Sequence, residues 1–96
     1  MIEAPDLSLY VYEGCGYCAR VLRALGRLGV RVEIRDIDEE PKHEAALLSA
    51  RGRRTVPVLR IAGPDGRVEW MPESADIVDY LERRFGGAPP GPRASG

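Results

Sequence analysis

The stretch Leu7-Ser8-Leu9-Tyr10-Val11-Tyr12-Glu13-Gly14-Cys15-Gly16-Tyr17-Cys18 decides how this chain folds. Its first half is short and rich in residues that favour extended backbone, so it predicts a β-strand over residues 7–12. Glu13-Gly14 interrupt that pattern, and apolar residues then recur at helical spacing. They are Cys18, Val21, Leu22, Leu25 and Leu28. Both cysteines therefore stand where a strand gives way to a helix.

Strands and helices continue to alternate along the rest of the chain. Gly29 predicts the end of the first helix, because glycine readily takes the left-handed conformation that ends helices. Asp38-Glu39-Glu40-Pro41 predicts a second helix start, with acidic residues at its positive end and proline in its first turn. The other expected elements are strands at 30–35, 58–61 and 67–71, a turn at 63–66, the end of the second helix at Gly52, and a last helix that Ser74 caps and that runs to Phe85.

The element order strand–helix–strand–helix–strand–strand–helix predicts an α/β fold. We expect a four-stranded mixed sheet with helices on both faces, in which a right-handed crossover makes the first two strands parallel and a short loop makes the last two a hairpin. Ligands of such sheets bind beyond the carboxyl ends of the parallel strands, which is where Cys15 and Cys18 lie. Residues 1–86 are expected to form one domain and residues 87–96 a flexible Gly/Pro-rich tail.

Composition excludes several functional classes. The 96 residues include 14 Lys and Arg against 15 Asp and Glu, a net charge of −1 that provides no footprint for nucleic acid or an anionic membrane. No apolar run approaches the roughly 18 residues that span a bilayer. The first residues contain neither a basic nor an apolar segment typical of a secretion signal, so we expect a cytoplasmic protein, whose thiols stay reduced.

The two cysteines favour redox chemistry over a structural role. A disulfide between Cys15 and Cys18 would close too short a ring to constrain the unfolded chain, and with His43 they still fall short of the four ligands of a usual zinc site, so we expect no metal. The free N–H groups of a helix start favour the thiolate form at Cys15, and only a thiolate attacks a disulfide. Cys18 lies one turn further into the helix. We therefore expect Cys15 to attack and Cys18 to resolve the resulting mixed disulfide; the alternative is a pair of buried core cysteines.

Two further motifs accompany Cys15-Gly16-Tyr17-Cys18: Thr55-Val56-Pro57 before the third strand and Glu73-Ser74 at the last helix. Together they make residues 7–85 resemble a glutaredoxin of the thioredoxin superfamily. The resemblance implies a thioredoxin-like fold, a cis peptide bond before Pro57 and glutathione as co-substrate. It also implies the activity of a glutathione-dependent thiol–disulfide oxidoreductase, which reduces protein–glutathione mixed disulfides and protein disulfides.

The resemblance further implies where glutathione binds. The main chain of Val56 is expected to pair with the cysteinyl backbone, Ser74 and the helix start to bind the γ-glutamyl carboxylate, and Glu73 or Asp76 to pair with the α-amino group. An arginine just before Thr55 is expected to bind the glycyl carboxylate, and Arg54 is preferred to Arg53 because glutaredoxins often have a basic residue there. The full predicted site comprises Tyr17, Arg54, Thr55, Val56, Pro57, Glu73 and Ser74, beside the catalytic Cys15 and Cys18.

Three departures from the glutaredoxin pattern leave alternatives open. Gly16 replaces a common proline, and relatives with a small residue there can hold a [2Fe–2S] cluster between two subunits through the first cysteine and glutathione, so a dimeric cluster carrier ligated by Cys15 is one alternative. Tyr12 replaces a common lysine. Pro72-Glu73-Ser74 resembles the N-terminal domain of glutathione transferases instead of the usual glycine pair. The last two departures favour a second alternative, a protein with the same redox chemistry that takes electrons from thioredoxin reductase instead of glutathione. Unless a cluster is bound, we expect a monomer.

Overall fold

The computed structural model describes residues 1–86, and within them the predicted element order and α/β class are confirmed. The expected tail, residues 87–96, lies outside the described part. The elements are β1 (Ile2–Val11), α1 (Gly16–Leu28), β2 (Val30–Asp36), α2 (Pro41–Arg51), β3 (Val58–Ala62), β4 (Val68–Met71) and α3 (Ser74–Phe85).

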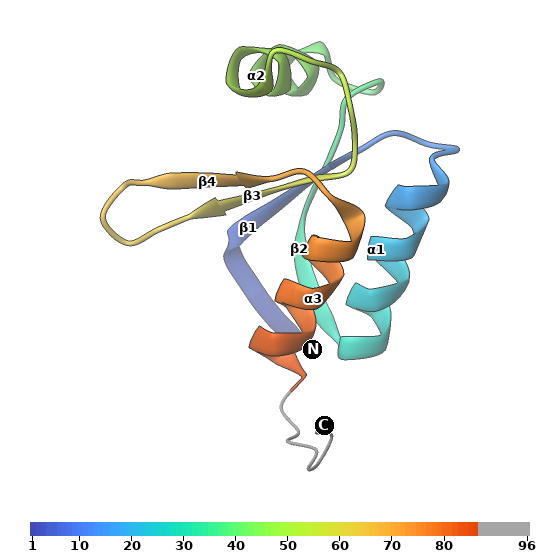
Figure 1. Ribbon diagram of the computed structural model, residues 1–96, viewed down its shortest axis with the longest axis vertical. Coiled ribbons are helices and arrows are strands. Elements are labelled where there is room, and N and C mark those ends of the chain that lie inside the picture. Colours follow the sequence, from blue (N-terminus) through green and yellow to red (C-terminus); the bar gives the residue numbers. More distant parts are fainter. Residues whose placement is uncertain (87–96) are drawn as a thin grey trace.

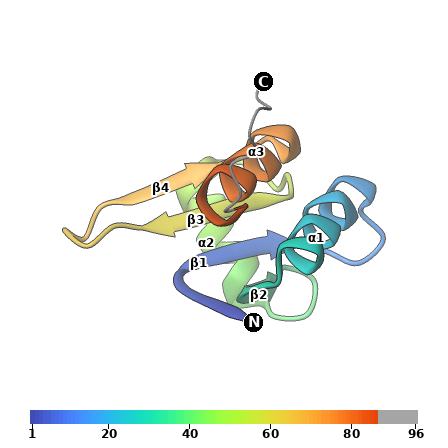
Figure 2. The same ribbon diagram turned by 90° about the horizontal axis from the view of Figure 1, so that it is seen from below.

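The four strands form one mixed sheet in the order β2-β1-β3-β4. Strand β1 runs parallel to β2 and antiparallel to β3, and β3 and β4 form the predicted antiparallel hairpin. Helices α1 and α3 lie side by side on one face, and α2 lies on the other (Figures 1 and 2). No helix within residues 1–86 has the length and apolar character needed to cross a bilayer.

Strand β1 supplies side chains to the core on both faces of the sheet, because successive residues of a strand point in opposite directions. Leu7, Leu9 and Val11 face α1 and α3 and pack in the larger core. Tyr10 faces α2 and packs in a smaller core with Ile37, Leu47 and Val58. The central place of β1 in the sheet explains why its second half is almost entirely apolar.

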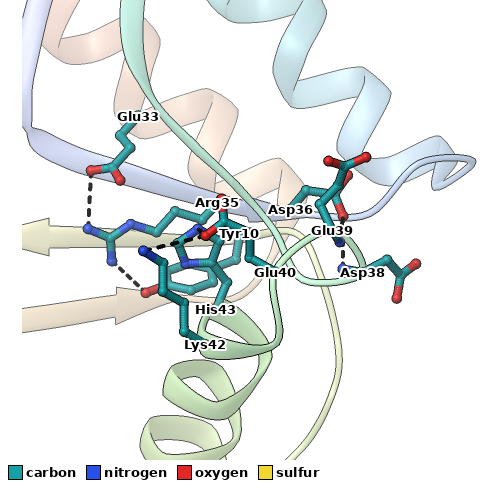
Figure 3. A network of polar contacts seen from close by, with 9 residues as sticks. All are labelled: Tyr10, Glu33, Arg35, Asp36, Asp38, Glu39, Glu40, Lys42 and His43. Atoms are coloured by element: carbon teal, nitrogen blue, oxygen red, sulfur yellow. Dashed lines mark hydrogen bonds and ion pairs between the residues drawn. The ribbon is translucent and has the colours of Figure 1, made fainter.

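Tyr10 carries a polar group into the smaller core, and charged side chains beside β1 satisfy it. Its hydroxyl oxygen accepts a hydrogen bond from Nη1 of Arg35 at 2.7 Å. Arg35 also donates to Glu33 at 3.1 Å, so the fully buried phenol is linked to a surface carboxylate (Figure 3). This network lies at the sheet face that α2 covers.

The predicted bounds of the first strand are wrong at both ends. Strand β1 begins at Ile2, five residues before the predicted start, because Ile2 pairs with Val30 on β2. The register shifts between Glu3 and Ser8, a stretch containing Pro5, which has no N–H to donate; the strand bends there (Figure 1). At its other end β1 stops at Val11, one residue before the predicted Tyr12.

The start of α3 also differs from the prediction. Glu73, not Ser74, is the N-cap: its backbone is extended, and its carbonyl accepts the first helical N–H, from Ile77, at 2.9 Å. Ser74 is the first helical residue and is buried. Its N–H is therefore one of the free donors of the helix start, whereas the predicted side-chain cap is absent.

Candidate active site at the start of helix α1

Cys15 is the N-cap of α1. Its backbone is extended (φ −86°, ψ 117°), and its sulfur accepts a hydrogen bond from the backbone N–H of Cys18 at 3.2 Å. A sulfur in this place does what a serine or aspartate oxygen does at other helix starts. Because the N–H groups there carry partial positive charge, the site stabilises negative charge on the Cys15 sulfur.

Cys18 lies one turn further along, inside the larger core. It is only 2% exposed, and both cysteines are free thiols. Burial, together with the neighbouring Cys15, raises the pKa of the Cys18 thiol from 9.0 to about 12. Cys18 is therefore protonated at neutral pH, and the two sulfurs are chemically distinct.

The loop between α2 and β3 reaches the Cys15 sulfur from the other side. The peptide bond between Val56 and Pro57 is cis, as the sequence resemblance implies. Cys15 Sγ lies 3.9 Å from the carbonyl oxygen of Val56, within reach of a weak S–H···O hydrogen bond, although the two residues are 41 positions apart. The fold thus brings the Cys15 thiol and the main chain of Val56 together.

A pocket of about 300 Å³ opens beside this contact. Its walls come from the start of α1, from the end of α2 with the loop that follows, and from the start of α3. They consist of Tyr17, Arg51, Arg53, Thr55, Val56, Pro57, Pro72, Glu73 and Ser74. Of the predicted binding residues, Arg54 and Asp76, the alternative to Glu73, are outside this lining, and the others are in it. Three segments distant in the sequence therefore form one site.

The pocket presents charges of both signs. Arg51 and Arg53 contribute two cations, Glu73 contributes a carboxylate, and the N–H groups at the start of α3 lie beside Ser74. Nε of Arg51 is buried and has no hydrogen-bond partner within residues 1–86. Such a pocket suits a ligand that carries carboxylates together with an amine. Tyr17, 66% exposed, forms its open rim.

Sequence reasoning missed Arg51 and ranked Arg53 below Arg54. Arg51 is the last residue of α2, where a basic side chain is readily explained by the negative end of the helix. Arg54 lies outside the pocket lining and is paired with two carboxylates, Glu44 and Asp38. These neighbours, Glu44 foremost, raise the pKa of the Arg54 guanidinium above its ordinary value.

A family model for the N-terminal domain of glutathione S-transferases matches residues 9–89. The chain belongs to this family. The match includes both cysteines, the cis-proline loop and the start of α3, so each segment of the pocket is part of the family domain.

Glutaredoxins are also among the similar proteins. Glutaredoxin 2 of Escherichia coli K12 is 30% identical over 80 residues, which are 83% of this chain and 34% of that protein. A solved buckwheat glutaredoxin–glutathione complex is 32% identical, with a TM-score of 0.60, over 82% of this chain and 69% of that one. This glutathione S-transferase N-terminal domain therefore shares its fold with a glutaredoxin.

Some relatives carry much more than this domain. Maleylacetoacetate isomerase from Anaeromyxobacter dehalogenans 2CP-1, solved with bound GSH, is 30% identical, with a TM-score of 0.66, over 88% of this chain and 41% of that one. The chain spans about a third of the length of the curated relatives it matches. In these proteins the domain is one part of a larger whole.

The structure also bears on the metal alternatives. Within residues 1–86 there is no group of three or more His, Cys, Asp or Glu side chains that could hold a metal ion. His43, interpreted from the sequence as a surface residue, is half-buried against the Tyr10 ring and lies 3.7 Å from Glu40 (Figure 3). The space beside Gly16 is open, with no heavy atom within 4 Å of a Cβ placed there. A [2Fe–2S] cluster shared by Cys15 from two chains stays a prediction.

Proposed function

We propose that this chain is a glutathione-dependent thiol–disulfide oxidoreductase whose nucleophile is Cys15. One observation carries the proposal: the Cys15 sulfur sits at the positive end of α1 and 3.9 Å from the carbonyl of Val56, which lines the charged pocket. The glutathione-bound buckwheat glutaredoxin and Anaeromyxobacter isomerase support glutathione as the ligand of this family. Thiolate attack on a disulfide is the chemistry that this sulfur is best placed to perform.

Glutathione matches the pocket in charge. We place its γ-glutamyl carboxylate at the start of α3 beside Ser74 and its α-amino group near Glu73. The cysteinyl backbone then pairs with Val56, and the glycyl carboxylate meets Arg53 and Arg51. This orientation directs the glutathione sulfur toward Cys15.

The proposed reaction proceeds in two exchange steps. The Cys15 thiolate attacks the glutathione sulfur of a protein–glutathione mixed disulfide. A disulfide bond forms between Cys15 and glutathione, the disulfide bond between glutathione and the protein sulfur breaks, and the protein thiolate takes up a proton from water. A second glutathione, as thiolate, attacks the same glutathione sulfur. This produces oxidised glutathione, one half of which comes from the mixed disulfide, and restores Cys15 as thiolate, so each turnover releases one protein thiol and consumes one free glutathione.

Cys18 is needed only when the substrate is a protein disulfide. After Cys15 has formed a mixed disulfide with a protein, the Cys18 sulfur attacks Cys15, loses its proton to water and releases the protein thiolate. Because burial, and then Cys15, raises the pKa of Cys18, loss of the Cys15 charge in the mixed disulfide eases this ionisation. The Cys15–Cys18 disulfide is then reduced by two glutathiones.

Single-cysteine variants test these roles. With a glutathionylated peptide, glutathione and glutathione reductase, Cys15→Ser is expected to lose turnover to the uncatalysed rate. Cys18→Ser is expected to retain most turnover of this substrate but to lose reduction of a protein disulfide. Turnover by Cys15→Ser would overturn the proposal, and loss of both activities in Cys18→Ser would overturn the assigned division of labour.

The electron source is tested with the same substrate. The two pocket arginines and Glu73 favour glutathione, so thioredoxin with thioredoxin reductase, or that reductase alone, is expected to sustain little turnover. Turnover with the reductase alone would favour the alternative donor. Visible absorption and dimerisation after anaerobic reconstitution with iron, sulfide and glutathione would favour the cluster carrier instead.

A further inference from the structure

Arg54 connects three segments around the candidate site without lining the pocket. It lies in the loop between α2 and β3, two residues before Val56. Its Nε donates to the Glu44 carboxylate in the first turn of α2, and its Nη2 donates to Asp38 in the turn between β2 and α2. Its guanidinium carbon lies 5.6 Å from the centre of the Tyr12 ring. The Arg54 side chain thus contacts the start of α2, the turn before α2 and the segment that follows β1.

The partners of Arg54 are themselves held in place. The Asp36 carboxylate accepts the backbone N–H groups of Asp38 at 2.8 Å and of Glu39 at 3.1 Å, which fixes the turn that carries Asp38 (Figure 3). Tyr12 is half-buried and packs against the smaller core under α2. Arg54 therefore contacts anchored groups on both sides.

These contacts bear on the distance between Cys15 and Val56. Tyr12 precedes Cys15 by three residues, and Arg54 precedes Val56 by two. The cation–π contact between Arg54 and Tyr12 joins the loop before Val56 to the segment that leads to Cys15, and Cys15 Sγ lies 3.9 Å from the Val56 carbonyl oxygen. A guanidinium is suited to this role because its planar fork can bond two carboxylates while its face lies on an aromatic ring.

We propose that Arg54 is a positioning residue that holds the Arg53–Val56 stretch of the pocket against the Cys15 loop. This inference rests on the proposed function for its effect on catalysis. Charge favours positioning over direct binding of a ligand carboxylate: two carboxylates already neutralise Arg54, whereas Arg51 and Arg53 face the pocket.

The kinetic test removes Arg54 and, separately, its partners. Arg54→Ala is expected to raise the KM for a glutathionylated peptide about tenfold and to change kcat less than twofold, because ligand contacts are misplaced while the sulfur is unaltered. The double variant Asp38→Asn/Glu44→Gln is expected to raise KM in the same direction. If Arg54 bound the ligand directly, freeing it from these carboxylates would lower KM or leave it unchanged, and that result would overturn the proposal.

Matched controls separate positioning from general damage. Arg67→Ala removes an exposed arginine paired with Asp65 in the β3–β4 turn and should leave KM unchanged. Arg54→Lys keeps the charge but loses the planar fork, so a positioning role predicts only partial recovery of KM. Full recovery with lysine would show that charge alone matters and would overturn the proposal.

A readout without activity keeps the inference separate from the proposed function. In Arg54→Ala, amide hydrogen exchange of residues 53–56 is expected to accelerate at least fivefold relative to Arg67→Ala, with an unchanged urea midpoint. Unchanged exchange would overturn the positioning role whatever the enzyme does. If exchange is accelerated in Arg54→Ala but the wild-type protein does not turn over glutathione disulfides, the positioning role stands and only the proposed function is overturned.

Discussion

Cys15 and Cys18 differ in the surroundings of their sulfur atoms. Cys15 is half-buried and accepts an N–H group at the start of α1, whereas Cys18 is almost completely buried in apolar surroundings. One helical turn therefore separates a sulfur for which negative charge is favourable from one for which it is costly. We propose different chemical roles for the two cysteines because Cys15 lies at the helix start beside the pocket and Cys18 lies in the core.

The raised pKa of Cys18 predicts how stability depends on pH. Below pH 9 the thiol is protonated in both states; between 9.0 and about 12 the folded state retains the proton that the unfolded chain loses, so stability falls as pH rises. The Cys18→Ser variant has no thiol at this position, so its stability lacks this fall with rising pH. At pH 7 it is expected to be about 1–2 kcal/mol less stable because it buries a hydroxyl.

The difference in the free energy of unfolding between wild type and Cys18→Ser is expected to narrow by about 1.4 kcal/mol for each pH unit above 9. Urea unfolding in the presence of a reductant, at intervals between pH 7 and 10.5, measures it. A difference that stays constant would show that the Cys18 thiol ionises equally readily in both states.

Helix α1 shows how the same residue type has opposite effects at two places in one element. Gly26 has ordinary helical backbone with no heavy atom within 4 Å of a Cβ, whereas Gly29 ends the helix at φ +70°. The Gly29 N–H bonds back to the carbonyls of Gly26 and Leu25. Glycine is needed only at the second position, because L side chains are strained at positive φ.

The effect of an alanine substitution on the free energy of unfolding is therefore expected to be opposite at Gly26 and Gly29. Gly26→Ala should raise the free energy of unfolding by about 0.5–1 kcal/mol through helix propensity, and Gly29→Ala should lower it by about 1 kcal/mol. Thermal or urea unfolding of the two variants measures both. Equal effects of the two changes would contradict the assigned end of α1.

Across the whole molecule, one ion pair joins the two ends of the domain. Nη1 and Nη2 of Arg84 in α3 donate to the two carboxylate oxygens of Asp6 in β1, at 2.9 and 3.1 Å. Arg84 thereby lowers the pKa of Asp6 below its ordinary value of 3.8. Because these residues are 78 positions apart, the pair connects the first strand to the last helix.

Asp6→Asn is expected to reduce stability by about 0.5–1 kcal/mol at neutral pH, a small value because the pair is partly exposed. A lowered pKa stabilises the fold above the unfolded value, so the difference should persist at pH 5–7 and disappear as pH falls below 3.8 through the lower folded value. Asp79→Asn is the control, since Asp79 pairs with Arg83 within the same helix. If Asp79→Asn lost as much stability as Asp6→Asn, the long-range pair would contribute no more than a pair within one helix.

The candidate site is the point at which prediction from sequence and tertiary structure diverge. Spacing alone predicted that Cys15 lies at a helix start and Cys18 in its apolar stripe, because these are local properties of the backbone. It could not distinguish Arg51, Arg53 and Arg54, whose distances to the pocket depend on how the loop after α2 packs on Tyr12 and Asp38.

Periodicity and turn residues by themselves determined the order of the elements, the class of the sheet and the place of the cysteines, since hydrophobic spacing and the conformational limits of glycine and proline act over a few residues. Only the tertiary structure decided that β1 extends to Ile2, that Glu73 caps α3, and which arginines line the pocket. Those features depend on pairing and packing between segments far apart in the chain, and no local pattern of residues records such contacts.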